Sequence, residues 1–75
     1  MVVGRLSYNH ENGRYGLIKG GLWEHYGFHC GETFEVDVNG EWVWTRMEIH
    51  VTGVWFLVGT PYYSELENII ARISK

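Results

Sequence analysis

The sequence predicts one small domain that is mostly antiparallel β-sheet and ends in a single helix. Three observations lead to this fold class. The chain has 75 residues, which is the size of one domain. Short runs of alternating apolar and polar residues are separated by Gly-containing turns, as in β-hairpins. A Ser-x-x-Glu motif followed by apolar residues at helical spacing lies near the C-terminus.

The N-terminal part of the chain is predicted to form a hairpin. Residues 4–8 alternate between polar and apolar, and apolar residues resume at 15–18. Asn12-Gly13 suits the turn between them, because Asn and Gly tolerate positive φ. Residues 22–31 follow neither a strand nor a helix period, so we expect an irregular loop there with room for one short strand.

A three-stranded meander is predicted next. Residues 34–38 alternate, and Asn39-Gly40 follows them directly, which is the strongest short-range signal for a hairpin. The partner strand is expected over 41–51, and a turn at Thr52-Gly53 leads into 54–58. About five strands then form either a small curled antiparallel sheet or an SH3-like barrel.

The C-terminal segment is predicted to be a helix over about 64–74. Ser64 and Glu67 have the spacing of a capping box. Four apolar residues then fall on one helical stripe at i, i+3, i+4 and i+7: Leu66, Ile69, Ile70 and Ile73.

Composition narrows the classes of function. Cys30 is the only cysteine, so no intrachain disulfide is expected, and a cytoplasmic location is predicted. Four Trp, five Tyr and three Phe make aromatic packing, or oligomerisation, the expected source of stability. The longest apolar run, 54–58, is too short to cross a bilayer, and we expect no signal peptide. A net charge of −3 disfavours nucleic acid.

The strand over 41–51 carries the strongest candidate for a binding site. Its odd positions are mostly apolar, and Val43 and Met47 are expected to face the core. Its even positions then share the opposite face: Trp42, Trp44, Arg46 and Glu48. Exposed aromatic residues are favoured anchors of protein interfaces. The alternative is that the C-terminal helix or the 22–31 loop covers both tryptophans in a second small core.

Acidic residues on the preceding strand form a second candidate surface. Glu35 and Asp37 share one strand face and could meet a basic partner as an auxiliary surface. The alternative is that they are the solvated face of an edge strand.

Cys30 and the histidines beside it do not have the spacing of a metal or catalytic site. His25 and His29 are four residues apart but stand beside a single thiol, whereas structural zinc sites use four ligands. Adjacent strand residues point to opposite faces, so His29 is poorly placed to activate Cys30. We expect a small buried Cys30, no metal, no cofactor and no catalysis; a thiol or metal function at Cys30 remains a lesser alternative.

Five segments resemble a family of short bacterial proteins that is catalogued as a domain of unknown function. They are Gly-Arg-Leu at 4–6, Gly-Arg-Tyr-Gly-Leu at 13–17, Gly-Phe-His-Cys-Gly-Glu at 27–32, Trp42 with Thr-Arg-Met-Glu at 45–48, and Val-Gly-Thr-Pro-Tyr at 58–62. The resemblance covers nearly the whole chain and points to Firmicutes and their phages and mobile elements. It implies a compact domain with no assigned activity, so no functional residue is carried over.

These observations together predict a non-catalytic protein-binding module. The binding residues are expected to be Trp42, Trp44, Arg46 and Glu48, and the partner is either another protein or a second copy of the chain. The resemblance also implies an origin in phages or mobile elements. This origin suggests one narrower form of the function, a stoichiometric inhibitor of a host defence protein. The main alternative is a β-barrel that binds single-stranded nucleic acid by aromatic stacking.

Overall fold

The computed structural model describes residues 1–74, and these residues form one antiparallel sheet without any helix. The strands are β1 (Val2–Asn9), β2 (Arg14–Lys19), β3 (Leu22–His25), β4 (Thr33–Val38), β5 (Glu41–Ile49), β6 (Trp55–Leu57) and β7 (Ile70–Ile73). Their order across the sheet is β3-β2-β1-β7-β4-β5-β6. The sheet is curled but not closed, so the SH3-like barrel is not formed.

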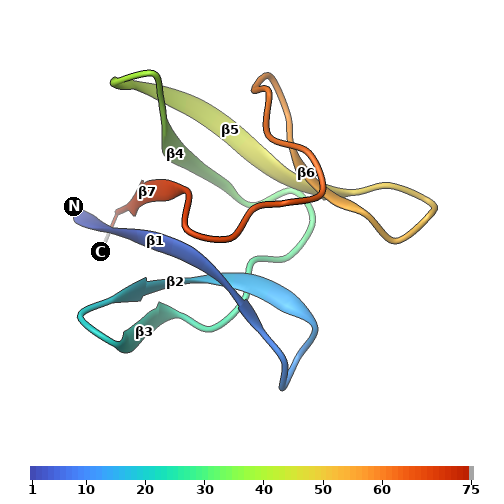
Figure 1. The fold of residues 1–75 in the computed structure, drawn as a ribbon, viewed down its shortest axis with the longest axis horizontal. Coiled ribbons are helices and arrows are strands. Elements are labelled where there is room, and N and C mark those ends of the chain that lie inside the picture. The colour runs from blue at the N-terminus through green and yellow to red at the C-terminus, as the bar shows by residue number, and fades with distance from the viewer. Residues whose placement is uncertain (75) are drawn as a thin grey trace.

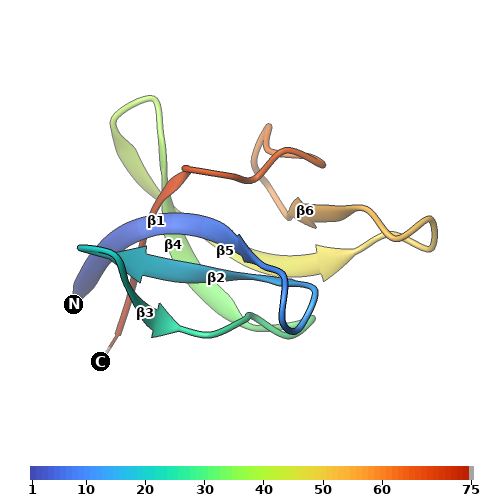
Figure 2. The same cartoon turned by 60° about the horizontal axis from the view of Figure 1, so that its bottom comes forward.

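The C-terminal strand holds the two halves of the sheet together. Figure 1 shows β1, β2 and β3 on one side of β7 and β4, β5 and β6 on the other, and Figure 2 shows the same ribbons turned. Ala71 of β7 pairs with Gly4 of β1 and with Val36 of β4. The last strand in the sequence is therefore a central strand of the sheet.

The predicted helix over 64–74 is wrong. Ser64 and Asn68 have φ of 67° and 68°, which a right-handed helix does not tolerate. Glu67 does not cap a helix but accepts hydrogen bonds from the Ser7 hydroxyl at 2.7 Å and from the Tyr8 backbone N–H at 2.8 Å. The segment is a loop followed by β7, which explains one of the strands beyond the expected five. No helix in residues 1–74 could span a membrane.

The predicted hairpins are confirmed. Asn39 and Gly40 have φ of 53° and 87°, as a type I′ turn requires at both central positions. Asp37 Oδ1 also accepts a hydrogen bond from the Gly40 N–H at 2.8 Å. Gly13 in the first hairpin has φ of 71°. The expected loop at 22–31 begins with the short edge strand β3, whose pairing with β2 contains a bulge.

The core lies on the concave inner face of the sheet. Cross-strand neighbours such as Leu6 with Leu17 and Met47 with Leu57 meet there, and Phe28 stacks on Phe34 with 4.3 Å between ring centroids. Burial of each such side chain contributes roughly 1.5–3 kcal/mol. The buried apolar residues are Leu6, Leu17, Phe28, Phe34, Val36, Met47, Leu57, Leu66, Ala71 and Ile73.

Strand β5 follows the expected alternation only where the sheet covers it. Met47 is fully buried and Val43 is half-buried, both on the inner side. The apolar residues Ile49 and Val51 follow at the next odd positions but are 41% and 97% exposed. The β5–β6 hairpin extends away from the other strands there (Figure 1).

Candidate functional site: an outer tryptophan face

Three strands, β4, β5 and β7, present their outward side chains on one continuous surface. Cross-strand partners in a sheet share a face, and the register pairs Trp42 with Asp37, Trp44 with Glu35, and Arg46 with Thr33. Arg72 of β7 lies opposite Glu35 on the same face. We call this surface the outer tryptophan face; its residues are Thr33, Glu35, Asp37, Trp42, Trp44, Arg46, Glu48 and Arg72.

Trp42 is held in place by a buried ion pair. The Arg72 guanidinium carbon lies 4.3 Å from the centroid of the Trp42 ring. Arg72 donates through Nε and a terminal nitrogen to the two carboxylate oxygens of Glu35, at 2.9 and 3.1 Å. Glu35 is only 8% exposed, and the Arg72 side chain is 27% exposed, so the carboxylate end of the pair is buried and the guanidinium end reaches the surface. Trp42 keeps 37% of its surface exposed although its orientation is restrained.

Trp44 lies at the centre of the face and is 66% exposed. It borders a hollow of about 380 Å³ whose other lining residues are Thr33, Thr45, Arg46 and Val58. Two of these lining residues are joined, because the Thr45 hydroxyl donates to the Val58 carbonyl at 2.8 Å. An exposed indole beside such a hollow is suited to receive an apolar or aromatic side chain.

Arg46 and Glu48 form the expected pair along β5. Arg46 Nε donates to Glu48 Oε2 at 2.7 Å, and the two side chains are 51% and 29% exposed. An exposed pair of this kind contributes about 0–1 kcal/mol to stability. Its main effect is to orient the Arg46 guanidinium beside Trp44.

The four predicted binding residues thus share one face, and both tryptophans are outside the core. Of the two residues of the predicted auxiliary acidic surface, Glu35 is not available as a free acid, and a binding role for Asp37 stays a prediction. Glu35 is buried against Arg72 and is not a free acid, because β4 lies between β7 and β5 and is not an edge strand. Asp37 is half-buried on the face. Arg72 was missed, since the sequence placed it on a helix.

Cys30 is exposed, so the expectation of a buried cysteine is wrong. It lies in the turn 29–32, where the Glu32 N–H donates to the His29 carbonyl at 3.1 Å. Within residues 1–74, no group of three or more His, Cys, Asp or Glu side chains is arranged to hold a metal ion. A thiol function at Cys30 therefore rests on exposure alone.

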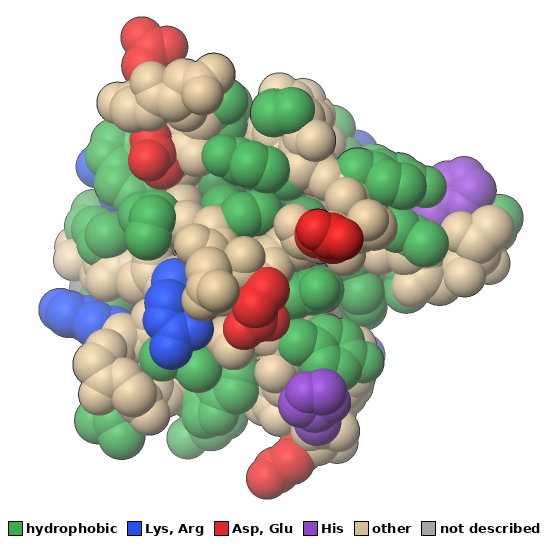
Figure 3. All heavy atoms as spheres, viewed as in Figure 1, with side chains coloured by type: hydrophobic (Ala, Val, Ile, Leu, Met, Phe, Trp, Pro, Cys, Tyr) green, Lys and Arg blue, Asp and Glu red, His purple; other side chains and the backbone are tan. Residues whose placement is uncertain are grey.

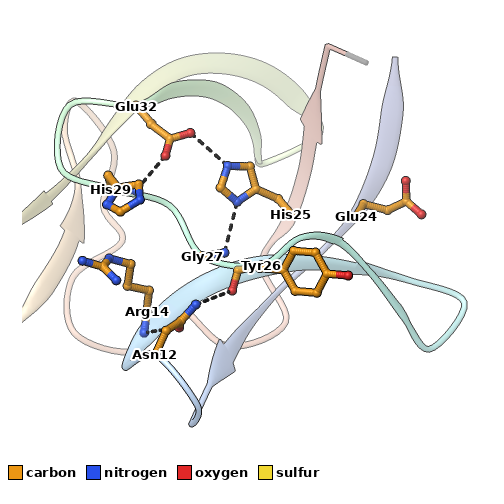
Figure 4. A pocket seen from close by; sticks show the side chains of 8 residues that line it. All are labelled: Asn12, Arg14, Glu24, His25, Tyr26, Gly27, His29 and Glu32. Atoms are coloured by element: carbon orange, nitrogen blue, oxygen red, sulfur yellow. Dashed lines mark hydrogen bonds and ion pairs between the residues drawn. The ribbon is translucent and has the colours of Figure 1, made fainter.

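A second hollow, of about 480 Å³, lies beside this turn (Figure 4). His25 Nε2 lies 2.9 Å from Glu32 Oε2, and His25 Nδ1 accepts from the Gly27 N–H at 3.1 Å. Both ring nitrogens are therefore engaged, and His25 has none left to act as a base. Burial raises the pKa of Glu32, but the hydrogen bonds from the His29 N–H and from the His25 side chain outweigh it, so this pKa lies below its ordinary value. The hydrogen bonds of His25 and Glu32 thus connect residues of the segment 25–32 to one another.

Geometry defines the class of protein: a small, open, antiparallel β-sheet domain with a tryptophan-bearing outer face. The family model described as "Domain of unknown function (DUF5348)" matches residues 4–73, and the chain belongs to this family. A protein from Ruminococcus gnavus, known from a crystal structure, is 36% identical, with a TM-score of 0.80 over 96% of this chain and 100% of that one. No curated protein matches the chain. Ruminococcus gnavus is a member of the Firmicutes, in line with the resemblance.

Proposed function

We propose that this chain is a non-catalytic protein-binding module and that the outer tryptophan face is its contact surface. One observation carries the proposal: Trp44 is 66% exposed at the centre of a sheet face, beside a hollow and an oriented arginine. Tryptophan and arginine are the residue types most enriched among residues that dominate binding energy. A large exposed indole in so small a chain gains a favourable contact only when a partner covers it.

Restraint of the side chains supports the same function. Trp42 is held by Arg72, and Arg46 is held by Glu48. Side chains that are already ordered lose less conformational entropy on association, so more of the contact energy appears as affinity. The face is therefore prepared for binding before a partner arrives.

Affinity capture tests the proposal. The tagged chain is incubated with a lysate of a Firmicutes host in which the untagged chain is also expressed, and the captured proteins are identified by mass spectrometry. We expect Trp44→Ala to lose the specific partner. Leu22→Ala is the matched control, because Leu22 is 70% exposed on β3 at the far edge of the sheet. Identical captured proteins for the wild type and Trp44→Ala would refute the proposal.

The identity of the captured protein also tests the narrower form of the function. A stoichiometric inhibitor encoded by a phage or mobile element would retain a host protein, such as a component of a defence system. Capture of the untagged chain would instead identify self-association. In both cases the retained protein should be lost with Trp44→Ala.

Single-stranded nucleic acid is the second candidate, because two exposed indoles on one β-face could stack with bases. Charge weighs against it: Glu35, Asp37 and Glu48 share the face with Arg46 and Arg72, and the net charge is −3. On the face seen in Figure 3, acidic and basic side chains are interspersed and form no basic patch. Fluorescence anisotropy at low salt should detect no binding of oligonucleotides; a salt-dependent rise at micromolar protein would favour this candidate.

A further inference from the structure

Opposite charges lie on the two sides of Trp44 on the outer tryptophan face. Asp37 lies opposite Trp42 on one side of Trp44, and Arg46, which pairs with Glu48, lies on the other side. Trp42 and Arg46 are each two residues from Trp44, or about 7 Å along the strand. Along the face, Asp37 and Trp42 therefore come first, Trp44 follows, and Arg46 with its partner Glu48 comes last.

We propose that the partner of this face is a second copy of the same chain, in an isologous dimer with Trp44 at the two-fold axis. This inference rests on the proposed function. The axis lies between the two faces, perpendicular to β5, and so reverses the direction of the second strand. Each Trp44 then packs on its counterpart, and each Arg46 meets Trp42 and Asp37 of the other copy. Every contact occurs twice, as isologous symmetry requires.

The side chains at both ends of the face suit this arrangement. Arg72 lies over the Trp42 ring, which still has 37% of its surface exposed for the incoming Arg46. Asp37 uses Oδ1 for the Gly40 N–H, which leaves Oδ2 for the guanidinium. Glu48 restrains Arg46 through Nε only, so the terminal nitrogens of Arg46 remain for the partner.

Glu35, which lies near the proposed two-fold axis, does not disfavour the dimer. Glu35 pairs with Trp44 across the strands, so the axis brings the two copies of Glu35 near each other. Each carboxylate is already neutralised by two bonds from Arg72, at 2.9 and 3.1 Å. The like-charge contact that would otherwise disfavour the dimer is therefore cancelled within each copy.

A second copy fits this face better than a foreign partner with a surface of one charge. An acidic partner surface would oppose Asp37, and a basic one would oppose Arg46. A face that carries both charges at equal distances from a central tryptophan matches its own reversed image. Association also stabilises a chain of this size, whose single core is small.

Analytical ultracentrifugation of the full chain over a wide concentration range tests the dimer. We expect a monomer–dimer equilibrium, and a dissociation constant at least tenfold higher for Trp44→Ala because each dimer loses two indoles. Leu22→Ala should leave it unchanged. Arg46→Gln provides a second test that leaves every indole in place; it should weaken the dimer several-fold and retain the native circular dichroism spectrum.

The indole N–H resonances of the four tryptophans locate the interface. As the protein concentration rises, the resonances of Trp42 and Trp44 should shift, while those of Trp23 and Trp55 should stay constant. A chain that is monomeric at all concentrations overturns the dimer but leaves the proposed function standing, provided that Trp44→Ala still loses a captured protein. A dimer that is indifferent to Trp44→Ala, or that shifts Trp23 or Trp55, overturns the assignment of the surface itself.

Discussion

The ion pair between Glu35 and Arg72 provides a measurable link between the core of the sheet and its outer face. We consider Arg72→Leu, which removes the two bonds at 2.9 and 3.1 Å from the carboxylate of Glu35, a residue that is 8% exposed in the native fold. Loss of one partner of a buried pair costs about 3 kcal/mol. Loss of the contact with Trp42 adds about 1 kcal/mol. The expected total is thus about 4 kcal/mol.

Such a loss is large for a domain of 75 residues, whose whole free energy of unfolding is roughly 4–11 kcal/mol. Urea denaturation followed by circular dichroism measures it. The double variant Glu35→Leu with Arg72→Leu should be less destabilised than Arg72→Leu alone, because it leaves no unpaired carboxylate. A loss below about 1 kcal/mol in Arg72→Leu, or equal losses in the single and double variants, would refute the reasoning, since an exposed pair behaves in that way.

Three further predictions concern turns, packing and pH. Gly40→Ala should lower the free energy of unfolding by about 1–2 kcal/mol in urea titrations, because position 40 has φ of 87°. Gly16→Ala should prevent folding, detected as loss of the native circular dichroism spectrum, since a Cβ there would collide with the His25 carbonyl oxygen and lie 2.9 Å from the Trp23 ring. The lowered pKa of Glu32 stabilises the fold above pH 4.5, and this contribution is lost as pH falls through the folded-state pKa. Because the Glu32 side chain is 37% exposed, the effect should be below about 1 kcal/mol; thermal melts should show that Glu32→Gln removes it.

Local signals in the sequence were sufficient where a structure depends on neighbouring residues. The Asn39-Gly40 turn and the alternation around Met47 are set by backbone sterics and by the two-residue repeat of a strand. These two features alone place Trp42 and Trp44 opposite the core. Most of the candidate surface could therefore be predicted before the fold was known.

Tertiary contacts decided the structure of the C-terminal segment and the partner of Glu35. The segment from Ser64 to Ile73 has helical spacing, but β1 and β4 offer backbone hydrogen bonds to the two sides of its last four residues, and Ile70–Ile73 becomes a central strand. That placement brings Arg72 to Glu35 and makes an apparently solvated acid part of a buried pair. Sequence by itself determined which side chains alternate; only the assembled sheet determined which strands are neighbours, because pairing over long distances along the chain leaves no periodic signal in the sequence.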